Sequence, residues 1–441
     1  MAVAVMRTKA EQAYTDQFES VAARLPGGPA VVEARKAAIL AFGGLGLPHR
    51  RIEEFKYSDL RTAFKDVPPP AVQDETAVTA ADLDAALGSL AGVEADRVVF
   101  VNGRYRPELS RIAPVQGIDV KPLGATLTEA PHKVAERLTH IAGASDALAQ
   151  LNTAYMTDGA IVRVAEGVQA VRPLLLVFAG AGSGQRMVTT RNVLSIGAGA
   201  HVTVCEAFVK LEGAAGGQSN TLTDIAVGDG AAVTHVKALM AGHDTHLATW
   251  IISLGAGTAY RGFQFTESPG LARNQMFVLF QGSGAKLDLS GAFMARGSEH
   301  IDTTLVVDHA EPGCESRELF KGVLDGAARG VFQGKIVVRQ KAQKTDGKQM
   351  AQALMLSENA EFDSKPELEI YADDVACGHG STSAQLDPDL VFYCRARGIP
   401  EAEARALLTE SFIGEAIDRV EDAPLREALM ASARRWLRAA G

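Results

Sequence analysis

The sequence predicts a mostly β protein whose core is a β-solenoid between a helical N-terminal domain and a helical C-terminal domain. Two observations predict it: glycine-containing turns recur at nearly constant spacing in the middle of the chain, and helical periodicity is confined to the two ends. At 441 residues the chain is too long for one ordinary globular core, and a repeat architecture spreads the core along one axis. The predicted domains are residues 1–150, 151–385 and 386–441.

The first 150 residues combine helical and strand patterns. Residues 10–25 and 80–90 carry the apolar spacing of amphipathic helices. Between the second of these segments and residue 110, Asn102-Gly103 follows a run of four apolar residues, which is a strong signal for a two-residue hairpin turn. This region is therefore expected to be mainly helical, with a hairpin.

The middle of the chain repeats one turn four times, at residues 197–199, 228–230, 255–257 and 282–284. Their first glycines are 31, 27 and 27 residues apart, and an apolar strand stands on each side of every turn. Such a unit cannot bury its own apolar face, so neighbouring units must stack. A coil of about 27 residues gives roughly eight coils and a rod about 40 Å long. A β-sandwich is the alternative, although sandwiches need not repeat one turn type at one period.

Helical periodicity returns after Leu386. Pro400 stands where a helix can begin, and an apolar residue recurs every four positions from Ala404 to Val420. A second helix is expected from Pro424. These helices either pack on the last coil or receive a partner.

Composition excludes several classes of function. The chain has 44 basic and 53 acidic residues, a formal charge of −9, and no basic stripe, which argues against a nucleic-acid partner. Its longest apolar run, at residues 174–181, is too short to cross a membrane, and the first residues fit neither a signal nor a transit peptide. The four cysteines form no CxxC pair. We therefore expect a cytoplasmic protein without a membrane or nucleic-acid partner.

No complete nucleotide-binding motif is present. Neither Gly334-Lys335 nor Gly347-Lys348 is followed by the Ser or Thr of a P-loop, and the glycine-rich stretch at 180–184 precedes a strand pattern where a dinucleotide site requires a helix. Any ATP consumption is therefore expected in another chain, and this chain is not expected to be an enzyme.

Residues 371–387 read YADDVACGHGSTSAQLD and contain the densest group of chemically active side chains. Asp373 and Asp374 are adjacent, so on a strand they point to opposite faces and serve a turn better than an acid/base pair. Cys377 and His379 are spaced i and i+2, so they share one face of an extended segment. A thiolate and an imidazole are ligands for iron or zinc.

Two ligands are too few for a closed metal site, which usually has four. His309, Glu311 or Cys314 could approach from an earlier coil, or a second subunit could supply the missing ligands. The alternative is a purely structural pair, a buried apolar cysteine beside an exposed histidine.

The same stretch, together with RRIEEFKYSDLR at 50–61, LNTAYMTDGAIVRVAEG at 151–167 and VFYCRARGIPEAEARALL from Val391, resembles the SufB/SufD family of iron–sulfur cluster assembly scaffolds. The resemblance spans nearly the whole chain and favours the SufD branch, because the cysteine-rich N-terminal motif and long insertion of SufB are absent. It departs from the family at Ala376 and Gly378, where Lys and Ser are common.

The resemblance implies a right-handed parallel β-helix that pairs with SufB through the β-helices and binds the ATPase SufC through its C-terminal helices. His379, and secondarily Cys377, would hold iron or a transient iron–sulfur cluster at the SufB interface. Phe412, Ile413 and Ile417 would contact SufC. No permanently bound cofactor is implied, flavin binding stays open, and a homodimer is possible in isolation.

Two other interpretations stay open. One is a SufB/SufD-like structural subunit that never contacts metal. The other is a β-helix enzyme, either a polysaccharide lyase or esterase or a hexapeptide-repeat acyltransferase, although neither the turn period nor the N-terminal residues favour it.

Overall fold

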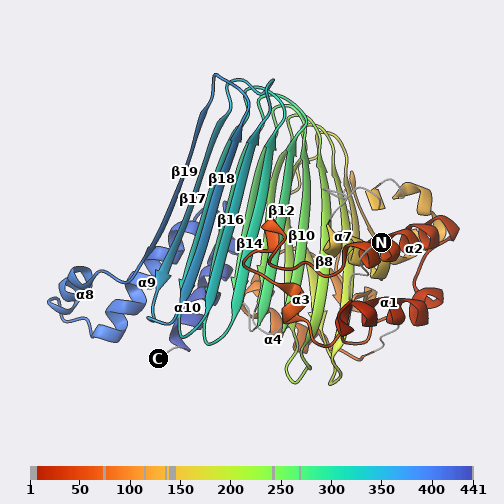
Figure 1. Cartoon of the computed structure of the whole chain (residues 1–441), viewed down its shortest axis with the longest axis horizontal. Helices are drawn as coiled ribbons and strands as arrows, with labels where there is room; N and C mark the ends of the chain where they lie inside the picture. Colours follow the sequence, from red (N-terminus) through yellow and green to blue (C-terminus); the bar gives the residue numbers. More distant parts are fainter. Residues whose placement is uncertain are drawn as a thin grey trace, which may run out of the picture.

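The computed structural model describes residues 7–72, 76–113, 116–134, 137–138, 146–240, 244–267 and 270–439. Within them the core is a parallel β-solenoid of about eight coils, and each coil gives one strand to each of two facing sheets (Figure 1). Consecutive strands of a sheet come from consecutive coils and run parallel, for example β10 between β8 and β12. The predicted fold class is confirmed, and the parallel pairing excludes a β-sandwich.

In the described residues, one sheet has ten strands and the other nine. The first contains β1 (Asp96–Val101), β2 (Arg104–Tyr105), β5 (Leu174–Gly180), β7 (His201–Lys210), β9 (Ala232–Leu239), β11 (Ala259–Glu267), β13 (Lys286–Ala295), β15 (Glu315–Leu324), β17 (Asp346–Met355) and β19 (Ala376–Ala384). The second contains β3 (Ile118–Pro122), β4 (Ala160–Val164), β6 (Arg186–Ile196), β8 (Gly217–Val227), β10 (Thr245–Leu254), β12 (Leu271–Phe280), β14 (His300–His309), β16 (Arg329–Val338) and β18 (Glu361–Ile370).

The repeated turns stack on one another at one corner of the coils. Their second glycines have positive φ, 63° at Gly199 and 66° at Gly230, which an L side chain rarely adopts. The Gly199 N–H donates to the Asp229 carbonyl of the next coil at 2.8 Å, and the Gly230 N–H donates to the Ala256 carbonyl at 2.7 Å. The turn signal therefore determines both the corner and the spacing of the coils.

The interior of the solenoid, which we call the lumen, is filled mainly by aliphatic and aromatic side chains. Phe100, Phe178 and Phe208 stack on successive coils with ring centroids 5.2 and 4.8 Å apart. Parallel stacking in register places equivalent side chains directly over one another, so an apolar position repeated in each coil becomes a continuous core.

The N-terminal region covers the first coils and also contributes to them. Its helices are α1 (Lys9–Val21), α2 (Pro29–Leu45), α3 (Leu60–Ala63), α4 (Ala80–Leu87), α5 (Leu123–Glu129) and α7 (Ala147–Tyr155). The expected hairpin is present, since β1 and β2 pair antiparallel across Asn102 and Gly103, both with positive φ. However, β1 pairs with β5 and β3 with β4, so strands from before residue 150 continue both sheets.

A segment between α2 and α3 crosses the outer face of the sheet that contains β12 and β14. Arg273 donates to Asp302 at 2.5 Å and to the Glu54 carbonyl at 2.7 Å, and its guanidinium lies 3.9 Å from the centre of the Phe55 ring. The Ser58 hydroxyl donates to the same Asp302 carboxylate. This buried ion pair fixes the N-terminal segment to the solenoid.

The C-terminal helices are α8 (Pro388–Arg395), α9 (Glu401–Ile417) and α10 (Ala423–Arg438). α9 packs against β13 and β15, and α10 packs against α9 and the 3-10 turn Gly88–Gly92, while α8 projects beyond the last coil (Figure 1). Both predicted helices are therefore present. None of the helices in the described residues is long and apolar enough to span a membrane.

Candidate metal site at the open end of the solenoid

The C-terminal end of the solenoid leaves two strand edges unpaired. In the described residues β19 pairs only with β17, and β18 only with β16, so both strands are outermost in their sheets. Ile370 and Tyr371, at the end of β18, are 42% and 59% exposed. We call this region, formed by β18 (Glu361–Ile370) and β19 (Ala376–Ala384), the open end.

Asp373 and Asp374 lie in the bend between these two strands, as their predicted structural role requires. The Lys344 N–H donates to the Asp374 carbonyl at 2.7 Å, and the Asp374 N–H donates to the Gln343 side-chain oxygen at 2.9 Å. Lys344 also forms an ion pair with the Asp374 carboxylate. The Asp374 carboxylate therefore connects stacked turns, in agreement with a structural role.

Cys377 and His379 lie on β19 and face the lumen. Cys377 is opposite Gly347 of β17 and packs against the lumen core, and His379, two residues further, is opposite Gln349. The shared face predicted from their spacing follows from this register. The Cys377 thiol is half-buried and the His379 side chain is exposed, so both are reached from the open end.

The Cys377 thiol is not poised to ionise by itself. Burial raises its pKa, and the nearby Asp346 and Glu318 carboxyls raise it further, while the Gly347 backbone N–H partly opposes this. A metal ion must therefore displace the thiol proton to gain a thiolate ligand.

The residues expected to complete the site from earlier coils do not gather there. His309 is buried and shares a hydrogen bond with Ser316 at 3.0 Å, Glu311 pairs with Lys341 at 2.6 Å, and the Cys314 thiol is buried 3.4 Å from the Gly282 carbonyl. In the part of the chain that the structure describes, no three His, Cys, Asp or Glu side chains form a metal-binding group. Of the two sources that the sequence left open, an earlier coil brings no third ligand to Cys377 and His379 in the described residues, which leaves a second subunit.

The residues predicted to contact an ATPase partner lie mainly inside the chain. Ile413 and Ile417 are fully buried in the cluster between α9, α10 and the outer face of the solenoid, and Phe412 is half-buried with the Lys321 ammonium 4.4 Å from its ring centre. The periodicity located an apolar stripe correctly, but that stripe faces the solenoid. The contact of these residues with an ATPase stays a prediction, since Ile413 and Ile417 already pack within the chain.

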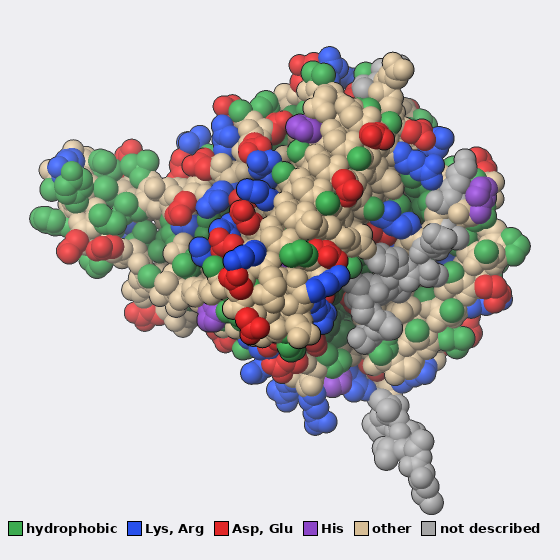
Figure 2. All heavy atoms as spheres, turned by 90° about the horizontal axis from the view of Figure 1, so that it is seen from above, with side chains coloured by type: hydrophobic (Ala, Val, Ile, Leu, Met, Phe, Trp, Pro, Cys, Tyr) green, Lys and Arg blue, Asp and Glu red, His purple; other side chains and the backbone are tan. Residues whose placement is uncertain are grey.

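Exposed apolar side chains lie instead on the projecting lobe made by α8 and the start of α9. Leu390, Phe392, Tyr393 and Leu407 are 50%, 70%, 56% and 46% exposed. Figure 2 shows hydrophobic side chains gathered on this lobe. We call these four residues the α8 patch. The sequence could have indicated this patch through the adjacent Phe392 and Tyr393, which cannot both face inward on a short helix.

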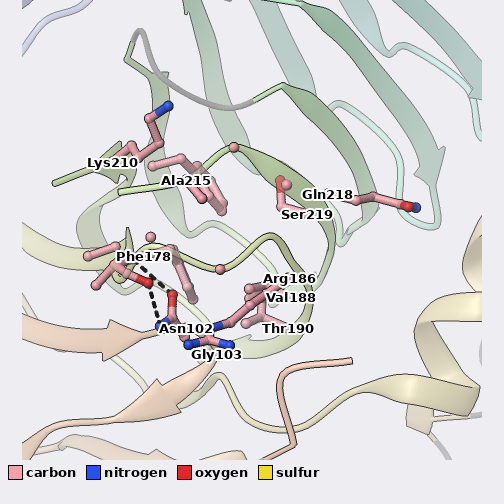
Figure 3. A pocket seen from close by; sticks show the side chains of 17 residues that line it. Asn102, Gly103, Phe178, Arg186, Val188, Thr190, Lys210, Ala215, Gln218 and Ser219 are labelled. Carbon is pink, nitrogen blue, oxygen red and sulfur yellow. Dashed lines mark hydrogen bonds between the residues drawn. The ribbon is translucent and has the colours of Figure 1, made fainter. Parts of the chain in front are cut away.

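A separate pocket lies far along the chain from the open end, between the turn after β5 and the turn after β7 (Figure 3). Phe178 and Phe208 line it, and Asn102 closes one side through a hydrogen bond to the Ala181 carbonyl at 3.0 Å. Lys210 and Gln218 extend away from its centre (Figure 3). Arg186, Thr190 and Ser219 line it beside the two rings, so the lining is mixed apolar and polar.

Both Gly-Lys pairs examined for nucleotide binding lie inside strands, Gly334-Lys335 in β16 and Gly347-Lys348 in β17. A phosphate-binding loop needs a turn that opens a helix, so neither pair forms one.

Comparison with known proteins identifies the family. A model of the "SUF system FeS cluster assembly, SufBD core domain" matches residues 178–412, and a model of the "SufBD protein N-terminal region" matches residues 8–176. The chain belongs to the SufBD family. The core match covers the solenoid from within β5 onward, Cys377 and His379, and all four residues of the α8 patch.

Curated relatives of similar length agree with this assignment. The chain is 30% identical to an iron–sulfur cluster assembly SufBD family protein of Synechocystis sp., over 90% of this chain and 89% of the relative. It is also 30% identical to the iron–sulfur cluster assembly protein SufD of Escherichia coli, over 88% of both chains. The SufD of Bacillus subtilis is 26% identical over 62% of this chain and 63% of its own length. The SufBD membership predicted from the sequence motifs is confirmed.

Proposed function

We propose that this SufBD chain is the SufD-type subunit of a SufB–SufC–SufD complex, where it acts as a cytoplasmic scaffold for iron–sulfur cluster assembly without catalysis of its own. The observation that carries the proposal is the open end, where a thiol and an imidazole face the lumen beside two unpaired strand edges. The SufD names among relatives of nearly equal length support the SufD branch.

The open end suits a second solenoid of the SufB type. An unpaired strand edge carries backbone N–H and C=O groups that a partner strand can satisfy. The half-buried Phe362 and Leu368 border the lumen core there, so pairing would also bury apolar surface. Such a partner would bring the ligands that His379 and Cys377 lack, and the iron or cluster held between the chains is cargo and not a resident cofactor.

The α8 patch suits the SufC-type ATPase. Exposed aromatic side chains concentrated on one projecting lobe are typical of the anchors that fill a partner's groove. The α8 patch is more exposed than Ile413 and Ile417, which are buried within the chain itself. α8 projects beyond the last coil at the same end of the rod as β18 and β19, so a partner bound to the α8 patch would lie beside the open end (Figure 1).

The experiment that tests the proposal is reconstitution with SufB-type and SufC-type partners, with a His379→Ala variant alongside the wild-type chain. Both chains should assemble, since His379 is exposed. Anaerobic iron titration and cluster absorbance should then show loss of binding in His379→Ala. Equal iron binding by both complexes would remove the ligand role and favour the purely structural subunit. Failure to assemble, or a stable homodimer only, would contradict the SufD assignment.

A further inference from the structure

A column of polar side chains extends from His379 into the lumen. Glu318 of β15, Gln349 of β17 and His379 of β19 occupy one register position in three successive strands of the sheet. Residues in register on parallel strands point to the same side. Phe320 and Ala351, which are two residues further along β15 and β17, belong to the lumen core, so the column faces the lumen.

Glu318 lies deep beneath the open end. Strands in a sheet are about 4.8 Å apart, so two spacings place Glu318 about 10 Å below His379. Both Glu318 and Gln349 are 3% exposed. Gln349 separates the carboxyl from the histidine, and its side-chain amide donates to the Gly334 carbonyl at 3.1 Å. Glu318 is therefore no direct ligand of an ion bound at His379, but it lies within electrostatic range.

The Glu318 carboxyl has few stabilising contacts. Within the described residues, neither of its oxygens makes a hydrogen bond of normal geometry, although the Ser316 hydroxyl lies close enough to favour the charged form slightly. Burial raises the pKa of Glu318 to about 8, so the carboxyl holds a proton at neutral pH. A buried acid without a partner is costly, and its presence calls for a function.

The charged and titratable groups around Glu318 come from several strands. Arg317 on its own strand lowers its pKa and Asp288 on β13 raises it, though less strongly than burial does. His309, at the end of β14, is buried and bonded to Ser316, and burial lowers its pKa to about 4, so it is neutral. Lys348 on β17 points to the outer face, and Cys377 and His379 on β19 face the lumen. No fixed cation therefore neutralises a Glu318 carboxylate from inside the lumen in the described residues.

We propose that Glu318 is the charge-compensating residue for a divalent cation held at Cys377 and His379, and that it releases its proton to solvent as the cation binds. The carboxyl O–H bond breaks, the electron pair stays on the carboxylate, and the proton passes to solvent water; no electron is transferred. A bound cation favours a nearby carboxylate over the neutral acid. Glu318 acts through the field in the lumen and touches neither the ion nor its ligands.

The size of the effect follows from Coulomb's law. A divalent ion about 10 Å from a carboxylate, at an effective dielectric constant of about 20, gains a few hundredfold in affinity. Because Glu318 is protonated at pH 7, the loss of its proton lowers this gain in affinity by a factor of about ten. The net contribution expected from Glu318 is therefore at least tenfold in iron affinity.

The inference rests on the proposed iron site, so its test uses the assembled complex. Anaerobic Fe²⁺ titration by calorimetry, in two buffers of different ionisation enthalpy, measures both the affinity and the protons released per iron. Glu318→Gln keeps the size of the side chain and should bind iron about tenfold more weakly and release about one proton fewer at pH 7. Glu318→Asp keeps the acid and should retain proton release.

A matched control is Glu206→Gln, which removes another carboxyl of the same lumen. Glu206 is fully buried on β7, where it pairs with His235 at 2.9 Å, far along the solenoid from the open end. Glu206→Gln should change neither the affinity for Fe²⁺ nor the number of protons released per iron.

The outcomes separate the two proposals. If His379→Ala binds iron as well as wild type, the proposed site fails. If His379→Ala loses iron while Glu318→Gln keeps the wild-type proton count, only the role of Glu318 is overturned. Weaker binding by Glu318→Gln with an unchanged proton count would also overturn it, because a merely structural defect gives that result.

Discussion

The two ends of the solenoid are built differently from the same kind of coil. At the N-terminal end, β1 extends one sheet and ends it with the antiparallel β2, and the antiparallel β3 ends the other sheet. Phe100 of β1 is fully buried there. At the C-terminal end, β18 and β19 have no such neighbours in the described residues, and Tyr371 is 59% exposed.

In the described residues, the difference is between an end that antiparallel strands complete and an end with two unpaired parallel strand edges. A strand edge is a liability that proteins usually cover, because it pairs with other chains. Here the covered end protects the core, whereas the uncovered end carries Cys377 and His379. The comparison therefore predicts that substitutions at the N-terminal end change stability, and that substitutions at the open end change assembly and metal binding.

The largest effect on stability is expected at the N-terminal end of the solenoid, which we call the closed end because β2 and β3 complete its sheets. Phe100→Ala removes a ring stacked 5.2 Å from Phe178 and should lower the free energy of unfolding by about 3–5 kcal/mol. Chemical denaturation of the isolated chain measures it. Phe362→Ala, at the half-buried counterpart on β18, should cost about 1 kcal/mol or less. Equal losses at both positions would contradict the comparison.

The next effect is on pairing at the open end. Ile370→Lys places a charge on an exposed apolar position and should weaken binding of a SufB-type partner about thirtyfold or more, without changing the stability of the chain. Val171→Lys is the matched control, since Val171 is 96% exposed but lies between β4 and β5 near the closed end. Sedimentation or calorimetry measures the affinity of both variants for the partner. An equal loss of affinity in Val171→Lys would contradict pairing through the open end alone.

The buried carboxyl of Glu267, at the end of β11 in the middle of the solenoid, should determine part of the pH dependence of stability. Burial raises the pKa of Glu267 to about 7, against the opposing Arg435 and Arg296. The folded chain thus binds more protons than the unfolded chain between pH 4.5 and 7, so the free energy of unfolding falls as pH rises through that window. Glu267→Gln should flatten this fall, by on the order of 2 kcal/mol. An unchanged pH profile would show that Glu267 ionises freely.

The smallest effect is expected at the α8 patch. Phe392→Ala should weaken binding of a SufC-type ATPase about tenfold and leave unfolding unchanged, because its side chain is 70% exposed. Ile413→Ala is the contrasting variant. It should lower the free energy of unfolding by about 2–5 kcal/mol, because Ile413 is fully buried on the inner face of α9. The α8 patch would not be the docking surface if Ile413→Ala weakened ATPase binding and left the free energy of unfolding unchanged.

Much of the fold was predictable because the repeated turn is a local signal. The turn itself requires the positive φ of the second glycine, and the first glycine lies against the backbone of the preceding coil, so the period of the turns reports the stacking. Helix termini were predictable for the same reason, since Pro400 and Pro424 act within one turn. The sequence did not predict which way the apolar stripe on α9 faces, because either the solenoid or a partner could cover it.

The sequence alone determined the solenoid, its helical ends and the pairing of Cys377 with His379 on one face of a strand, because all three depend on spacing along the chain. Only the tertiary structure decided that β19 is the outermost strand, that Ile413 and Ile417 face inward, and that Glu318 lies beneath His379. The physical reason is register: residues 318, 349 and 379 become neighbours only when coils of unequal length stack, and no local pattern records the length of each coil.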